Sequence, residues 1–283
     1  RDIKLQTLKR EVYLAYYNLS YAKNKERSYQ YLDSLYQNFA HAAKRRFELG
    51  ETNYLEMITA QSKQKQLETL YRQSQQEVMM FNALLKKIVQ VDEITVQEEP
   101  LQKLSMQSLT INEDAGLLYF EQSKSYYEAR LQQEKQSLLP DLSLQYFQGT
   151  NDGLNKNLIG YQFGLKIPLL FSGNTSKIKA SKIAQDIVEQ QHQDYKSKWQ
   201  AEQEALFAKL QQYNEAVIYY QTQGKQLSEE ILKTGERTFK EGEIDFFQYI
   251  QSIEISKDIE LTYLDNLNGY NQTIIAINYL ILD

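Results

Sequence analysis

The chain of 283 residues has a formal net charge of −5, and its 32 basic and 37 acidic residues are scattered, which excludes the basic footprint of a nucleic-acid-binding protein. It contains no cysteine, only 3 prolines and 11 glycines, and 22 tyrosines, a residue common at helix seams and membrane interfaces. It has no run of 18 apolar residues, so no transmembrane helix is predicted.

The first 90 residues are predicted to form two long helices. Apolar side chains recur at steps of three and four residues from residue 3 to about 46, and again from about 54 to 89. Between them, Gly50 suits the C-terminal cap of a helix, and Thr52 or Asn53 suits the N-cap of the next one. We therefore expect residues 1–90 to fold as an antiparallel helical hairpin with a tight turn.

Residues 91–112 lose this periodicity and are predicted to form a linker. They contain Pro100 and the acidic residues Asp92, Glu93, Glu98 and Glu99. The remainder, residues 113–283, is expected to begin with a helix up to about residue 137 and a strand hairpin at about 140–170. A long helix at about 175–240, capped by Asn174 or Thr175, then leads through a second tight turn to a last helix from 246 to about 282.

The segment 138–174 is the stretch with strand periodicity. Apolar side chains occupy every second position of two runs: Leu142, Leu144, Tyr146 and then Tyr161, Phe163, Leu165, Ile167. The turn between them, residues 149–157, is rich in Gly, Asn and Asp, and Pro140 and Pro168 bracket strands of roughly 8 residues. A tilted strand needs about 9–11 residues to cross a bilayer. Two strands are not stable alone, so they must pack on the helices or join strands of other chains.

An internal repeat relates two parts of the chain at a constant offset of 192 residues. The matched pairs are Tyr21/Tyr213, Leu35/Leu227, Phe47/Phe239, Gly50/Gly242, Glu51/Glu243, Tyr54/Phe246, Ile58/Ile250 and Tyr71/Tyr263. A repeat of this length indicates two copies of one unit, in which a tight glycine turn joins two long helices. The helix and strand hairpin that precede the second copy have no counterpart before the first, so we expect the natural protein to extend upstream.

The motif F-x-x-G-E at both turns, together with the segments 138–146 and 161–173, resembles the TolC family of outer-membrane efflux channels. The resemblance covers nearly the whole chain, and is strongest to the cation and drug efflux branch that works with resistance-nodulation-division pumps. It implies a mainly α fold with one β-hairpin: long antiparallel helices form a homotrimeric α-barrel, and the hairpin contributes to a transmembrane β-barrel in contact with outer-membrane lipid.

The resemblance also implies a function and a location. The protein would lie in the outer membrane of a Gram-negative bacterium, with a long periplasmic portion. It would passively export metal cations or small toxic compounds delivered by an inner-membrane resistance-nodulation-division pump. The two glycine turns would be periplasmic tips that dock a periplasmic adaptor protein, through Phe47, Gly50, Glu51, Phe239, Gly242 and Glu243.

Two further sets of residues follow from the resemblance. Several relatives narrow the periplasmic mouth with aspartates six and nine residues after the tip glycine. Those gate positions are Gln248 and Gln251 here, with Glu56 as the first-repeat counterpart, so the second tip departs from the acidic pattern. On the strands, Gln145, Gln162 and Lys166 are candidates for lumen-facing residues. The family has two strand hairpins per protomer and this chain has one, which suggests a fragment of a longer polypeptide.

Other side chains are expected to be structural. His41 and His192 are expected to be solvated, and Met79, Met80 and Trp199 to pack in helical stripes. The sequence shows no nucleophile–base arrangement, phosphate loop or metal cluster, so we expect no enzyme, cofactor or metal site. The alternatives are a periplasmic coiled-coil adaptor, which would carry several short strands on each side of its helical hairpin, and a structural scaffold without a pore.

Overall fold

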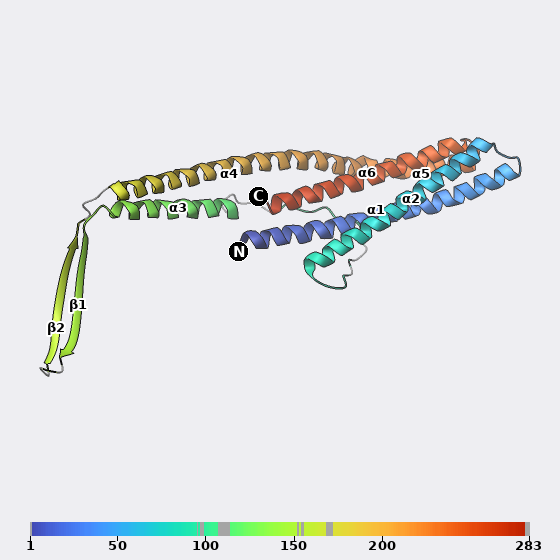
Figure 1. The fold of residues 1–283 in the computed structure, drawn as a ribbon. Helices are drawn as coiled ribbons and strands as arrows, with labels where there is room; N and C mark the ends of the chain where they lie inside the picture. The colour runs from blue at the N-terminus through green and yellow to red at the C-terminus, as the bar shows by residue number, and fades with distance from the viewer. Residues whose placement is uncertain are drawn as a thin grey trace. The chain divides into compact units, whose positions relative to one another are not determined.

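The structure, a computed structural model, describes residues 2–94, 96, 99–106, 114–151, 153, 156–167 and 172–280. The chain divides into two compact units, one of residues 1–109 and 201–281, the other of residues 110–200 and 282–283. The elements are α1 (Asp2–Glu48), α2 (Tyr54–Val89), α3 (Ala115–Gln136), β1 (Asp141–Asn151), β2 (Lys156–Lys166), α4 (Ser172–Tyr219), the π-helical turn η2 (Tyr220–Gly224), α5 (Lys225–Lys240) and α6 (Phe246–Asn278) (Figure 1). No helix in the described part of the chain is both long and apolar enough to span a membrane.

Two antiparallel helical hairpins make up most of the first unit. α1 packs along α2, α5 packs along α6, and α1 also contacts α6 (Figure 1). One hydrophobic cluster joins the two hairpins, and its buried members are Leu32, Tyr36, Ala43, Ala60, Phe246, Tyr249, Ile250 and Ile253. The two helices predicted before residue 90 are therefore present. That these two helices form the first of two copies of one repeated unit stays a prediction.

The long helix predicted at about 175–240 is interrupted by η2. Gly224, at the end of this π turn, is buried, and a Cβ there would lie 3.3 Å from Cδ2 of Tyr220 and 3.5 Å from Cγ2 of Ile259. Tyr220 stacks on Tyr263 of α6, with ring centroids 3.9 Å apart. A π turn adds one residue to a helical turn. The extra residue therefore rotates the side chains of α5 about the helix axis relative to those of α4.

The start of α4 also differs from the expectation. The helix begins at Ser172, so the predicted caps Asn174 and Thr175 lie inside its first turn. Asn174 instead donates from Nδ2 to the carbonyl of Ser137 at 3.1 Å, which ties the start of α4 to the end of α3. Pro168, expected to bracket the second strand, lies outside the described residues.

The packing of two methionines was predicted wrongly, whereas that of the single tryptophan is confirmed. Trp199 is buried, with 4% of its surface exposed. Met79 and Met80 are 62% and 55% exposed, because Val78 and Phe81 occupy the face of α2 that packs on α1.

The described part of the predicted linker has neither helix nor strand and is fastened to the helices. Asn271 of α6 holds it with both atoms of its side-chain amide. Oδ1 accepts from the Leu104 amide at 2.8 Å, and Nδ2 donates to the Gln102 carbonyl at 2.8 Å. Two apolar side chains of the segment are buried, Val96 and Leu101. Glu98 and residues 107–113 lie outside the described residues.

In the second unit, α3 lies beside the first part of α4, and the strand hairpin joins their neighbouring ends (Figure 1). Asp114 caps α3 by accepting from the Leu117 amide at 2.8 Å. Lys124 pairs with Glu189 at 2.7 Å. The ring of His192 stacks on Phe120 at 6.3 Å, so this histidine is half-buried rather than solvated.

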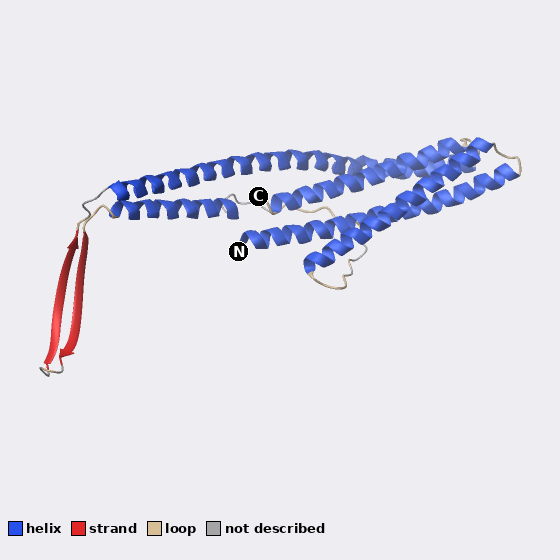
Figure 2. Cartoon of the chain, viewed as in Figure 1, coloured by secondary structure: helices blue, strands red, loops and turns tan. Residues whose placement is uncertain are grey.

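β1 and β2 form an antiparallel pair of 11 residues each, drawn in red in Figure 2. They are longer than the roughly 8 residues that the apolar alternation predicts. The reason is that backbone pairing continues beyond the alternating side chains. It runs from Asp141 opposite Lys166 to Asn151 opposite Lys156, and so includes Gly149, which the sequence pattern places in the turn.

Candidate functional site

The first tip lies between α1 and α2 and is built around Gly50. The φ angle of Gly50 is 73°, in the left-handed region that a glycine adopts without strain. Its amide donates to the Phe47 carbonyl at 3.0 Å, and the Glu51 amide donates to the Arg46 carbonyl at 2.8 Å. These two bonds satisfy carbonyls at the end of α1, as in a Schellman motif.

The second tip, between α5 and α6, repeats this backbone at an offset of 192 residues. Gly242 has φ of 75°. Its amide donates to Phe239 at 3.1 Å, and the Glu243 amide donates to Thr238 at 2.9 Å. The N-caps of α2 and α6 also correspond, because Asn53 and Asp245 each accept from the amide three residues on. The sequence pairs Gly50/Gly242 and Glu51/Glu243 thus occupy equivalent positions in two turns of the same geometry.

The two tips differ in the side chains that stabilise them. In the first, Oε1 of Glu56 pairs with Arg46 at 2.8 Å, and the Thr52 hydroxyl donates to Oε2 at 2.5 Å. Only 12% of the Glu56 side chain is exposed. In the second, the equivalent residue Gln248 accepts from the Asp245 amide at 3.0 Å and completes a capping box. An ion pair thus braces the first tip, and an uncharged amide braces the second.

The predicted docking and gate residues differ in their exposure to solvent. Glu51, Glu243, Gln248 and Gln251 are exposed, and Glu56 is buried. Glu51 and Glu243 lie in the turns themselves, and the exposure of Glu56, Gln248 and Gln251 follows from which face of α2 or α6 packs on its neighbour.

The two tip phenylalanines also differ in environment. Phe47 is 37% exposed and meets Tyr54 edge to face, with centroids 5.8 Å apart. Phe239 stacks on Tyr249, with centroids 4.6 Å apart, and packs against the hydrophobic cluster that joins the two hairpins. Phe239 therefore contributes to packing, which the repeat alone does not reveal.

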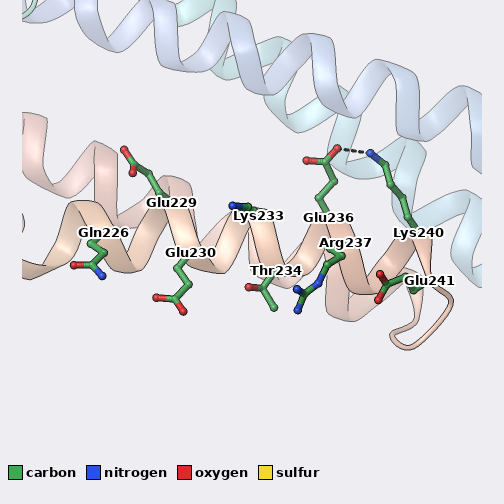
Figure 3. A pocket seen from close by; sticks show the side chains of 9 residues that line it. All are labelled: Gln226, Glu229, Glu230, Lys233, Thr234, Glu236, Arg237, Lys240 and Glu241. Carbon is green, nitrogen blue, oxygen red and sulfur yellow. Dashed lines mark hydrogen bonds and ion pairs between the residues drawn. The ribbon is translucent and has the colours of Figure 1, made fainter.

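A charged surface of α5 is a feature that sequence reasoning missed. Its residues surround a shallow hollow (Figure 3): Gln226, Glu229, Glu230, Lys233, Thr234, Glu236, Arg237, Lys240 and Glu241. Glu236 and Lys240 pair at 2.7 Å, one helical turn apart. The signal available in the sequence was the i, i+3 and i, i+4 spacing of opposite charges, which places them on one helix face.

The strand hairpin has two chemically different faces, which its register defines. One face is apolar and exposed, with Leu142 opposite Leu165, Leu144 opposite Phe163, and Tyr146 opposite Tyr161. The other face carries all three lumen candidates: Gln145 lies directly opposite Gln162, and Lys166 lies opposite Asp141. The predicted alternation is therefore confirmed, and the register brings the two glutamines together.

Within the described part of the chain, no group of three or more His, Cys, Asp or Glu residues is arranged to hold a metal ion. Individual carboxylates are instead committed to helix caps and ion pairs, as at Asp114, Asp245 and Glu56.

No protein-family model and no curated protein matches the sequence. The structure, in contrast, matches solved structures over nearly its whole length. It resembles a membrane protein from Pseudomonas aeruginosa, with a TM-score of 0.81 and 14% identity over 98% of this chain and 69% of that one. CusC gives a TM-score of 0.80 at 14% identity over 97% and 68% of the two chains. The outer-membrane channel OprN gives 0.77 at 16% identity over 98% and 67%. The chain thus has the fold of the TolC-family outer-membrane channels.

Proposed function

We propose that the chain is a protomer of an outer-membrane efflux channel in a Gram-negative bacterium, with its helices in the periplasm. The observation that carries the proposal is the fold, which extends over 98% of the chain at a TM-score of 0.81. OprN is described as an outer-membrane channel, and the work on CusC concerns transmembrane channel formation. Export through such a channel is passive, so the proposal needs no catalytic residue and no cofactor.

The strand hairpin supports this role through its two faces. Seven apolar side chains alternate along it, and those of Leu142, Phe163 and Tyr161 are 66–80% exposed. Lipid is the environment that such a face fits, with the Gln145 and Gln162 face turned to a water-filled lumen. A two-stranded sheet leaves both edges unpaired, so the hairpin must join others in a closed barrel. We propose that these hairpins come from the copies of a homotrimer, as the resemblance to the TolC family implies.

The tips are the proposed site for a periplasmic adaptor and, through it, an inner-membrane resistance-nodulation-division pump. Two turns of the same geometry, each with an exposed glutamate after its glycine, offer an adaptor two related contacts. Exposed Gln248 and Gln251 are the proposed gate residues. At the first tip, Glu56 would have to leave Arg46 before its carboxylate could face a passage. The proposed cargo is metal cations or small toxic compounds.

Export and membrane location test the proposal together. The full-length natural protein is produced with its adaptor and pump in a Gram-negative host that lacks its own efflux channels. We expect the protein to require detergent for extraction from the outer-membrane fraction and to lower the accumulation of a toxic dye or metal. A protein that stays soluble and monomeric without detergent would exclude the channel.

Charge reversal tests docking at the tips. Glu51→Lys combined with Glu243→Lys should abolish export while trimers form normally, because both side chains are exposed and neither supports the turn backbone. Gly242→Pro, which the φ of 75° forbids, should also abolish export. Asp186→Lys on the exposed surface of α4 is the control. Normal export by the double variant would exclude docking through these glutamates.

A further inference from the structure

The proposed lumen face of the strand hairpin carries an apolar section between polar ones. Starting at the helix end, the opposed pairs on this face are Asp141 and Lys166, Ser143 and Gly164, Gln145 and Gln162, Phe147 and Gly160, Gly149 and Leu158, and Asn151 and Lys156. Polar residues thus give way to Phe147 and Leu158, and polar residues follow again at the pair beside the turn. In the isolated chain these two side chains are 57% and 50% exposed.

Phe147 and Leu158 are not placed to meet lipid. The apolar face of the hairpin already extends from Ile167 to Ile159 on the opposite side of the strands. This stretch covers about 27 Å along the strand, which at a tilt of about 40° spans about 21 Å of the apolar band of about 25 Å on membrane barrels. Phe147 and Leu158 lie on the opposite face and do not extend this surface, so they need another environment.

A glycine opposite the phenylalanine shapes the wall at this level. A Cβ at Gly160 would lie 2.2 Å from both Cε2 and Cζ of Phe147, so the ring occupies the space that any larger residue would fill. Glycine weakens a strand, and a ring laid over it shields the exposed backbone. The pair therefore presents an aromatic surface, where the preceding pair, Gln145 and Gln162, presents amides.

We propose that Phe147 and Leu158 of the assembled protomers form an apolar collar inside the barrel, at the end remote from the helices, and that the collar limits the passage of hydrated ions. This proposal rests on the proposed function, since it takes the Gln145 and Gln162 face as the lumen. Apolar side chains facing water gain free energy by meeting one another. A narrow apolar ring also resists wetting, and hydrophobic constrictions gate channels in this way.

Single-channel conductance in planar bilayers, measured on the full-length protein in potassium chloride, tests the collar. Phe147→Ser and, independently, Leu158→Ser should raise the conductance about twofold, because a polar ring wets more readily. Phe163→Ser is the matched control on the opposite face and should leave the conductance of inserted channels unchanged. If the wild type carries no current, the proposed function fails. If the wild type conducts and neither lumen variant differs from it, the collar is excluded while the channel stands.

Cysteine labelling gives a second readout that does not depend on the stability of the serine variants. The 283 residues contain no cysteine, so Phe147→Cys introduces a unique thiol among them. A membrane-impermeant sulfonated methanethiosulfonate should modify this thiol and reduce the current, whereas Phe163→Cys should be protected by lipid. Modification at Phe163→Cys with none at Phe147→Cys would reverse the assignment of the two faces and overturn the proposal.

Discussion

The glycine at each tip offers a test in which backbone geometry alone sets the cost of a substitution. Gly50 and Gly242 have φ of 73° and 75°, and a Cβ added to either would have no heavy atom within 4 Å. Adopting the left-handed conformation costs a non-glycine residue roughly 1–2 kcal/mol. Replacing Gly by Ala also lowers the entropy of the unfolded chain, which stabilises the folded protein by about 0.4–1 kcal/mol. We expect Gly242→Ala to lower the free energy of unfolding by about 1 kcal/mol, or about fivefold in the equilibrium constant.

Urea denaturation of the purified protein, followed by circular dichroism, measures this change. The destabilisation should increase in the order Gly242→Asn, Gly242→Ala, Gly242→Val, since asparagine tolerates a positive φ and a β-branched residue does not. Gly173→Ala is the control, because Gly173 also faces open space but lies in the first turn of α4 without a positive φ. If Gly242→Asn destabilises as much as Gly242→Val, side-chain volume rather than φ sets the cost, and the reasoning is refuted.

Gly235→Ala places a Cβ 2.1 Å from Oγ of Ser252, which should cost about 1–3 kcal/mol; adding Ser252→Gly should recover most of the loss in urea midpoint. Deleting Gln223 removes the extra residue of the π turn and should rotate α5 by about 100°. The deletion should expose α5 to limited proteolysis, and an unchanged digestion pattern would contradict this. Burial, helped by the nearby Glu260 carboxylate, raises the pKa of Tyr220 from 10.0 to about 12. The unfolded chain therefore releases this proton first, and stability should fall between pH 10 and about 12; Tyr220→Phe should reduce the fall in a pH series of urea midpoints.

The sequence predicted those features that depend on periodicity. The alternation of Leu142, Leu144 and Tyr146 fixed the faces of the hairpin, because a strand has a period of two residues. The paired turns at Gly50 and Gly242 were predictable because a left-handed residue after a helix selects glycine. These signals are local, and the structure places both glycines at positive φ.

Features that depend on tertiary contacts could not be predicted in this way. The offset of 192 residues continues without a gap across η2, although α1 has no π turn at the equivalent place. The turn is accommodated by the stack of Tyr220 on Tyr263 and the buried Gly224, which only the folded pair of helices creates. The pairing of Arg46 with Glu56 likewise requires the turn to close first.

The two tips are joined by a shared aromatic core, and this constrains how they could separate. Phe39 of α1 meets Phe246 and Tyr249 of α6 edge to face, at 6.0 and 5.3 Å, and Tyr249 stacks on Phe239 of α5. Each such contact contributes about 0.5–1.5 kcal/mol beyond burial. Each turn is held by two backbone hydrogen bonds, donated by its glycine and by the glutamate that follows. Separating the two hairpins near their tips therefore requires repacking around Phe39 and loss of the Lys63–Glu254 ion pair at 2.6 Å.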